Sequence, residues 1–208
     1  MRLYLSSFRM GDRFDDLISA IGAGSNAVVV AKAVDFIPVE ARLAYARTGF
    51  DAVNHFRTHG LEADELDLRQ IFGRPADLEA ALVGVRLVWA NGGNAFLLRR
   101  AMRQSGLDEV LKRSVARGDL GYGGWSAGAV VAGPSLRGIE LMDDPDVVAA
   151  GYSAAPVWEG LALVDFSIVP HFQSDHVEAE AAARAHAYMT ANGIPHRTLR
   201  DGEVIVEY

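Results

Sequence analysis

One serine of the chain lies in a pattern typical of turns that expose a nucleophilic hydroxyl. Ser126 is the centre of Gly124-Trp125-Ser126-Ala127-Gly128, a G-x-S-x-G motif between a strand-like and a helical segment. The flanking small residues suit a backbone turn too tight for bulk. A helix beginning after Ser126 directs unpaired N–H groups at an oxyanion formed there. The pattern favours a catalytic serine, and its structural alternative is a tight turn with an N-cap serine.

A serine hydroxyl requires a base, and His171 is the histidine best placed to act as one. It follows the apolar segment 161–169, at the sheet edge where loops after parallel strands converge. His176 lies near the first turn of the next helix and is expected to line the same cleft. The remaining histidines have polar neighbours typical of surface positions: His55, His59, His186 and His196. The structural alternative for His171 is a buried, hydrogen-bonded imidazole.

The third group of such a site is a carboxylate that orients the imidazole. The segment between the serine and His171 contains Glu140, Asp143, Asp144, Asp146, Glu159 and Asp165. We predict Glu140 as the acid, because it lies on the first segment able to fold back over Ser126. Asp143 is the second choice, and Asp144 stays open as an alternative.

A second glycine-rich turn, Gly92-Gly93-Asn94, also follows a strand-like segment and precedes a helix. The backbone N–H of Gly93 is predicted to complete an oxyanion hole with that of Ala127. Asn94 is predicted to contact the substrate, and the alternative is an ordinary turn in which Asn94 is the helix N-cap.

The elements that position these residues alternate between strand and helix patterns. Predicted strands cover residues 2–6, 26–31, 61–68, 85–90, 120–124 and 161–169. Predicted helices cover residues 12–21, 38–59, 77–82, 95–104, 107–116, 127–132 and 176–191. Residues 134–160 form a loop, and residues 197–208 a terminal hairpin around Asp201-Gly202. This order predicts one α/β domain over residues 1–208, with three layers: a mostly parallel sheet and helices on both faces.

Composition excludes several classes of function. The 208 residues include no cysteine, which rules out disulfides, thiolate metal sites and cysteine nucleophiles. Lys and Arg total 20 against 27 Asp and Glu, a net charge of −7 that disfavours a nucleic-acid partner. The longest charge-free stretch is too short and too rich in glycine to span a membrane. We expect a cytoplasmic protein with no membrane partner, no cofactor and no metal.

Three segments carry a family resemblance: GGNAFLLRRAM (92–102), GYGGWSAGAVVAGPSLR (121–137) and VDFSIVPHF (164–172). In this order and spacing they resemble the peptidase E and cyanophycinase family of serine peptidases, whose fold is similar to that of class I glutamine amidotransferases. The resemblance covers nearly the whole chain. It implies Ser126 as nucleophile, His171 as base, and the amides of Gly93 and Ala127 as oxyanion donors.

Two departures from that family pattern concern the acid and the substrate. Where peptidase E has Asn-Asp after its Pro-x-x-Arg stretch, this chain has Gly138-Ile139-Glu140, which keeps Glu140 as the predicted acid. The family's His-x-x-Glu-x-Arg pattern is altered after His176, and an arginine follows only at Arg184. Arg184 is the predicted substrate-binding arginine, and a strict preference for Asp-X dipeptides is not expected.

The sequence thus predicts a serine exopeptidase, of dipeptidase or aminopeptidase type, acting on short peptides. Two alternatives share the same features. One is an esterase or amidase for small acyl groups, and the other is a catalytically silent amidotransferase-like domain used for binding. A homodimer is compatible with the composition.

Overall fold

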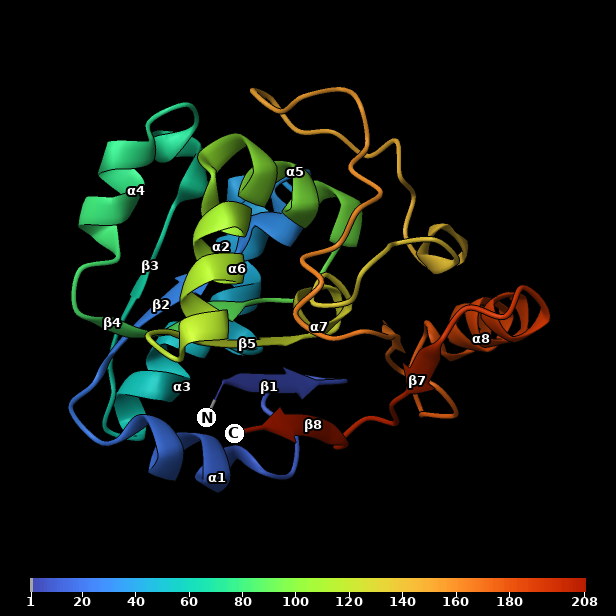
Figure 1. Cartoon of the computed structure of the whole chain (residues 1–208), viewed down its shortest axis with the longest axis horizontal. Coiled ribbons are helices and arrows are strands. Elements are labelled where there is room, and N and C mark those ends of the chain that lie inside the picture. The colour runs from blue at the N-terminus through green and yellow to red at the C-terminus, as the bar shows by residue number, and fades with distance from the viewer. Residues whose placement is uncertain (1) are drawn as a thin grey trace.

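A six-stranded sheet forms the centre of the computed structural model, which describes residues 2–208 (Figure 1). The strand order is β3-β2-β4-β5-β1-β8, and β8 alone pairs antiparallel. The strands are β1 (Leu3–Ser6), β2 (Asn26–Val30), β3 (Glu62–Glu65), β4 (Val85–Ala90), β5 (Gly121–Trp125), β6 (Ser167–Val169), β7 (His196–Thr198) and β8 (Val204–Glu207). The predicted mostly parallel sheet is confirmed.

Helices cover both faces of this sheet. They are α1 (Phe14–Ile21), α2 (Val39–Thr48), α3 (Ala52–Thr58), α4 (Pro75–Ala81), α5 (Ala95–Ser105), α6 (Leu107–Arg117), α7 (Ala127–Val130) and α8 (Ala179–Ala191). Short 3₁₀ turns are η1 (Lys32–Val34), η2 (Leu68–Ile71) and η3 (Ile139–Leu141). No helix in the described part of the chain is long and apolar enough to cross a membrane.

The two faces of the sheet bury separate sets of apolar side chains, as alternation along a strand requires. On one face, Tyr4 and Trp89 pack with side chains of α1 and α3 such as Phe56. On the other, Leu5 and Val88 pack with side chains of α5, α6 and α7. Both cores anchor the carboxyl ends of the parallel strands, where the loops that carry the functional residues emerge.

Several predicted elements are shorter than expected, and the cause is clear for two of them. The single helix predicted for residues 38–59 is two helices, because Asp51 caps α3 by accepting a hydrogen bond from the Asn54 N–H at 3.2 Å. The strand predicted for residues 161–169 is reduced to β6, since Ala162 has a positive φ of 51° that ordinary strands do not contain.

The predicted C-terminal hairpin is wrong, and the difference matters for the site. β7 pairs with β6 in a second, two-stranded parallel sheet, whereas β8 pairs antiparallel with β1 at the edge of the central sheet. Figure 1 shows β8 beside β1, and β7 apart from it near α8. The turn at Asp201-Gly202 therefore connects two sheets.

Candidate active site

Ser126 occupies a strained turn between β5 and α7. Its φ of 48° and ψ of −115° are unusual for a residue with a side chain, and its N–H donates to the carbonyls of Ser6 and Ser7 at 3.1 Å. The backbone beside it is closely packed: a Cβ at Gly124 would lie 2.7 Å from the Ala90 carbonyl oxygen. This packing explains why glycine precedes the serine. The strained conformation is held by neighbours rather than by local preference.

His171 follows β6 and is 1% exposed. Its φ is 60°, again a left-handed conformation, and its N–H donates to Ser7 Oγ at 2.8 Å. Its ring Nδ1 lies 2.7 Å from Asp201 Oδ1. Because the carboxylate accepts the Nδ1 proton, the electron pair on Nε2 is free to act as a base.

The prediction of Glu140 as the partner of His171 is wrong, because Asp201 holds that position. Glu140, in η3, accepts a hydrogen bond from the Gly138 N–H. The two alternatives are also engaged elsewhere: Asp143 accepts from the Ala95 N–H, and Asp144 from the Asp146 N–H. The carboxylate comes after the histidine in the chain, not between serine and histidine.

Asp201 reaches His171 because it lies in the turn that connects the two sheets. Its N–H donates to Ser174 Oγ at 2.8 Å, and its carboxylate accepts from Ser7 Oγ at 2.9 Å. Asp-Gly is a common turn pair, so the sequence indicated only the turn and not the side-chain contact.

Ser7 connects the three candidate catalytic residues and was missed in the sequence. Its carbonyl accepts the Ser126 N–H, and its hydroxyl bonds both the His171 N–H and Asp201. The Phe8 ring lies 5.5 Å from that of Trp125 and 6.0 Å from that of His171. Ser126 and His171, which are distant in sequence, therefore both hydrogen-bond Ser7 just after β1.

The second nitrogen of His171 faces a carboxylate. Its Nε2 lies 3.6 Å from Glu178 Oε2, and no hydrogen bond joins it to Ser126 among the described residues. Catalytic hydrogen bonds are often long before substrate binds. Burial lowers the pKa of His171 below its ordinary value, and the hydrogen bond with Asp201 opposes this shift. The net lowering favours the neutral imidazole that a base requires.

The glycine-rich turn after β4 lies beside the serine turn. A Cβ at Gly92 would meet the Trp125 ring at 2.8 Å, and one at Gly93 the Ala33 carbonyl oxygen at 2.7 Å. Among the described residues, neither the Gly93 N–H nor the Ala127 N–H donates a backbone hydrogen bond. Both predicted oxyanion donors therefore remain available.

Comparisons with known proteins identify the family to which the chain belongs. Residues 3–207 match the model of peptidase family S51. The chain belongs to this family. It is 35% identical over 176 residues to a peptidase E of Streptomyces coelicolor, covering 80% of this chain and 68% of that protein. It is 32% identical over 131 residues to a Drosophila melanogaster protein named "Probable alpha-aspartyl dipeptidase", covering 61% of this chain and 51% of that protein.

The fold is shared with a solved structure. A crystal structure of a peptidase E candidate from Listeria monocytogenes superposes with a TM-score of 0.70 at 22% identity, covering 99% of this chain and 96% of that one. The predicted resemblance to peptidase E and the predicted serine-type peptidase are confirmed at the level of family S51.

The three residues predicted to bind substrate in this S51 peptidase lie in surroundings that differ from one another. Asn94 caps α5 by accepting the Leu97 N–H, and its amide donates to the Asp144 carbonyl at 2.8 Å. His176 stacks on the His171 ring at 3.8 Å. Arg184, exposed on α8, forms an ion pair with Glu180 at 3.2 Å. Of the three, only His176 lies against His171.

Asp143 makes the stability of the S51 peptidase depend on pH. Desolvation raises its pKa to about 7, and its bond from Ala95 opposes the shift. The folded state therefore binds more protons than the unfolded state between about pH 4 and 7, so stability falls as pH rises through that range. We expect Asp143→Asn to remove this pH-dependent loss, which is about 4 kcal/mol for a pKa raised from its ordinary value to about 7.

Urea unfolding of wild type and Asp143→Asn at both ends of that range measures the difference directly. Asp144→Asn, on the neighbouring exposed carboxylate, is the matched control and should unfold like wild type. If wild type and Asp143→Asn lose equal stability as the pH rises, the pKa of the Asp143 carboxyl is not raised by folding.

Proposed function

We propose that the chain is a serine exopeptidase that hydrolyses short peptides through Ser126, His171 and Asp201. The observation that supports it most is the 2.7 Å contact of His171 Nδ1 with Asp201, at the same strand end that holds Ser126. Family membership supplies the class of reaction. The names of the relatives, peptidase E and alpha-aspartyl dipeptidase, support a dipeptide substrate.

In the proposed reaction, Ser126 Oγ attacks the scissile carbonyl carbon while His171 Nε2 removes its proton. Asp201 keeps the ring in the Nδ1–H tautomer and stabilises the imidazolium that forms. The carbonyl oxygen becomes an oxyanion, which the N–H groups of Gly93 and Ala127 bind. His171 then gives its proton to the departing amine, leaving an acyl group on Ser126.

Water completes the cycle by the reverse sequence of proton transfers. His171 removes a proton from water as the water oxygen attacks the acyl carbon, and it then returns that proton to Ser126 Oγ as the acyl product departs as a carboxylic acid. For the first step, Nε2 must turn from Glu178, 3.6 Å away, towards the serine hydroxyl. Substrate binding supplies this adjustment in the proposed mechanism.

A groove beside the catalytic centre suits one end of a short peptide. It has a volume of about 650 Å³, and its lining includes Phe8, Arg9, Phe50 and Gly202, the residue that follows Asp201 in the chain. The Arg9 guanidinium lies 5.0 Å from the Phe8 ring centre and 5.3 Å from that of Phe50. Its Nε is buried without a hydrogen bond, and Arg9 forms no ion pair among the described residues. We propose that Arg9 binds a peptide carboxylate.

Arg9→Met keeps most of the apolar stem and removes the charge. We expect KM for dipeptides with a free C-terminal carboxylate to rise about tenfold, because a charge-assisted pair is lost. C-terminally amidated peptides should change less. Arg13→Met, which removes an exposed arginine paired with Asp16, is the control. An equal rise for free and amidated peptides would argue against a carboxylate at Arg9.

The proposed function is tested by covalent labelling and substrate choice together. A peptidyl phosphonate should label Ser126, identified by mass spectrometry of the digested protein, and wild type should cleave dipeptides in a mixed library. Faster cleavage of simple acyl esters than of any peptide would favour the esterase alternative. Absence of both labelling and hydrolysis would favour the silent binding domain.

A further inference from the structure

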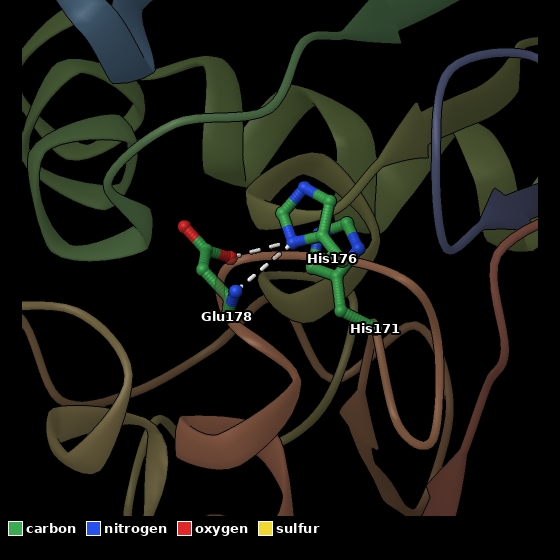
Figure 2. A group of neighbouring side chains, drawn as sticks. All are labelled: His171, His176 and Glu178. Carbon is green, nitrogen blue, oxygen red and sulfur yellow. Dashed lines mark hydrogen bonds and ion pairs between the residues drawn. The ribbon is translucent and has the colours of Figure 1, made fainter.

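Three side chains beside the catalytic centre form a compact group of metal-ligating atoms. Figure 2 shows His171, His176 and Glu178 close together. The two histidine rings are stacked, with centres 3.8 Å apart and planes 8° from parallel. One nitrogen or oxygen from each lies within 4.8 Å of those from the other two. We propose that these three residues bind a zinc-like divalent transition metal ion, and that the bound ion reversibly blocks the peptidase.

The first ligand of the proposed site is already oriented. Asp201 accepts the Nδ1 proton of His171 at 2.7 Å, which directs the Nε2 electron pair towards Glu178, 3.6 Å away. A carboxylate that orients the far nitrogen of a histidine is the usual second layer of a zinc site. The arrangement that prepares His171 as a base thus also prepares it as a ligand.

The other two ligands lie on the segment before α8. His176 Nδ1 accepts the Glu178 N–H at 3.2 Å, and this hydrogen bond must break before the Nδ1 electron pair can bind an ion. The Glu178 side chain is 40% exposed, which leaves it free to move towards an ion. Two imidazoles and one carboxylate form a donor set that zinc accepts, with a fourth position open to water.

Closing the site requires the ligand atoms to approach one another and a ring to rotate. Ligand atoms around a tetrahedral zinc ion lie roughly 3.3 Å apart, given bond lengths of about 2.0–2.2 Å. The present separations reach at most 4.8 Å. Because each electron pair lies in the plane of its ring, the stacked rings must also tilt towards one another. His171 is held by Asp201, so His176 and Glu178 supply most of this movement.

A filled site stops hydrolysis for a simple reason. The ion occupies the Nε2 electron pair that must accept the Ser126 proton, so the serine loses its base. This inhibitory role rests on the proposed function, whereas ion binding itself does not. No step of peptide hydrolysis passes through the metal.

Calorimetric titration of ZnCl₂ into the full chain carrying Ser126→Ala tests binding without any need for activity. We expect one ion per chain, and about tenfold or greater weakening with His176→Ala or with Glu178→Gln added. His186→Ala is the matched control, because it removes a histidine that already hydrogen-bonds His196 at 2.8 Å. Its Kd should equal that of the parent. Circular dichroism and thermal unfolding check that each variant folds.

Two results would overturn the site: no zinc binding to the folded parent, or binding that His176→Ala and Glu178→Gln leave unchanged. MgCl₂ provides a further comparison, because Mg²⁺ prefers oxygen ligands and should not compete. Competition by Mg²⁺ at similar concentration would also contradict a site built on two histidines.

Inhibition is measured on wild type at fixed pH, with EDTA added to reverse it. We expect hydrolysis to fall as zinc fills the site, and His176→Ala to require about tenfold more zinc for equal inhibition. Serine-dependent hydrolysis that saturating zinc leaves unchanged would refute the inhibitory role. If zinc binds as expected but no peptide is cleaved, the proposed function fails while the metal site stands.

Discussion

Replacing Ser126 with alanine is expected to lower kcat for dipeptide hydrolysis by about 10⁶-fold, with KM nearly unchanged. The variant keeps the backbone N–H groups proposed for the oxyanion but has no hydroxyl to form the acyl intermediate. Only the residual acceleration due to binding and the oxyanion donors would remain. The measurement is single-turnover hydrolysis of the best dipeptide in the library, with variant protein purified free of wild type.

The matched control for this experiment is Ser114→Ala on α6, which removes a serine hydroxyl remote from the motif. Its kcat should equal that of wild type. Near-normal turnover by Ser126→Ala would exclude this serine as the nucleophile, and the reaction would then require a different attacking group.

Changing Asp201 to asparagine is expected to lower kcat by about 10⁴-fold while the fold persists. The amide has nearly the same shape as the carboxylate, so one of its two groups takes the place of Oδ1, which lies 2.9 Å from Ser7 Oγ and 2.7 Å from His171 Nδ1. Its NH₂ group, however, donates to His171 Nδ1 and favours the tautomer with a proton on Nε2. That tautomer cannot accept the Ser126 proton, and the imidazolium loses its carboxylate.

Glu140→Gln is the comparison that decides which acid acts, because Glu140 bonds the Gly138 N–H and not His171. We expect its kcat to stay within about twofold of wild type, as for a surface substitution. The two variants should be compared across a pH series, since loss of Asp201 also removes a charge beside the imidazole. A larger loss from Glu140→Gln than from Asp201→Asn would reverse the assignment.

The local sequence was sufficient to predict the parts of the candidate site that depend on backbone conformation. The glycines around Ser126 are needed because the Ala90 backbone packs directly against that turn. His171 was found from its place after an apolar segment, since strand ends gather at one edge of a parallel sheet. Both features depend on residues that are neighbours in the chain, so residue type and spacing are enough to predict them.

The acid could not be found in this way. Asp201-Gly202 has the same appearance in a simple hairpin as in a connection between two sheets. The choice depends on whether β8 pairs with β7 or with β1, and both pairings satisfy the same short alternating pattern. Because β8 pairs with β1, the turn before β8 passes His171 and brings Asp201 into contact with its ring.

The sequence alone determined the order of strands and helices, the serine turn and the histidine, because each follows from local backbone preference and apolar spacing. Tertiary structure alone decided the contact of Asp201 with His171, the contacts of Ser7, the grouping of His176 and Glu178 beside His171, and the place of Arg9. These contacts join segments distant in the chain. They arise from strand pairing and packing between elements, which no local window contains.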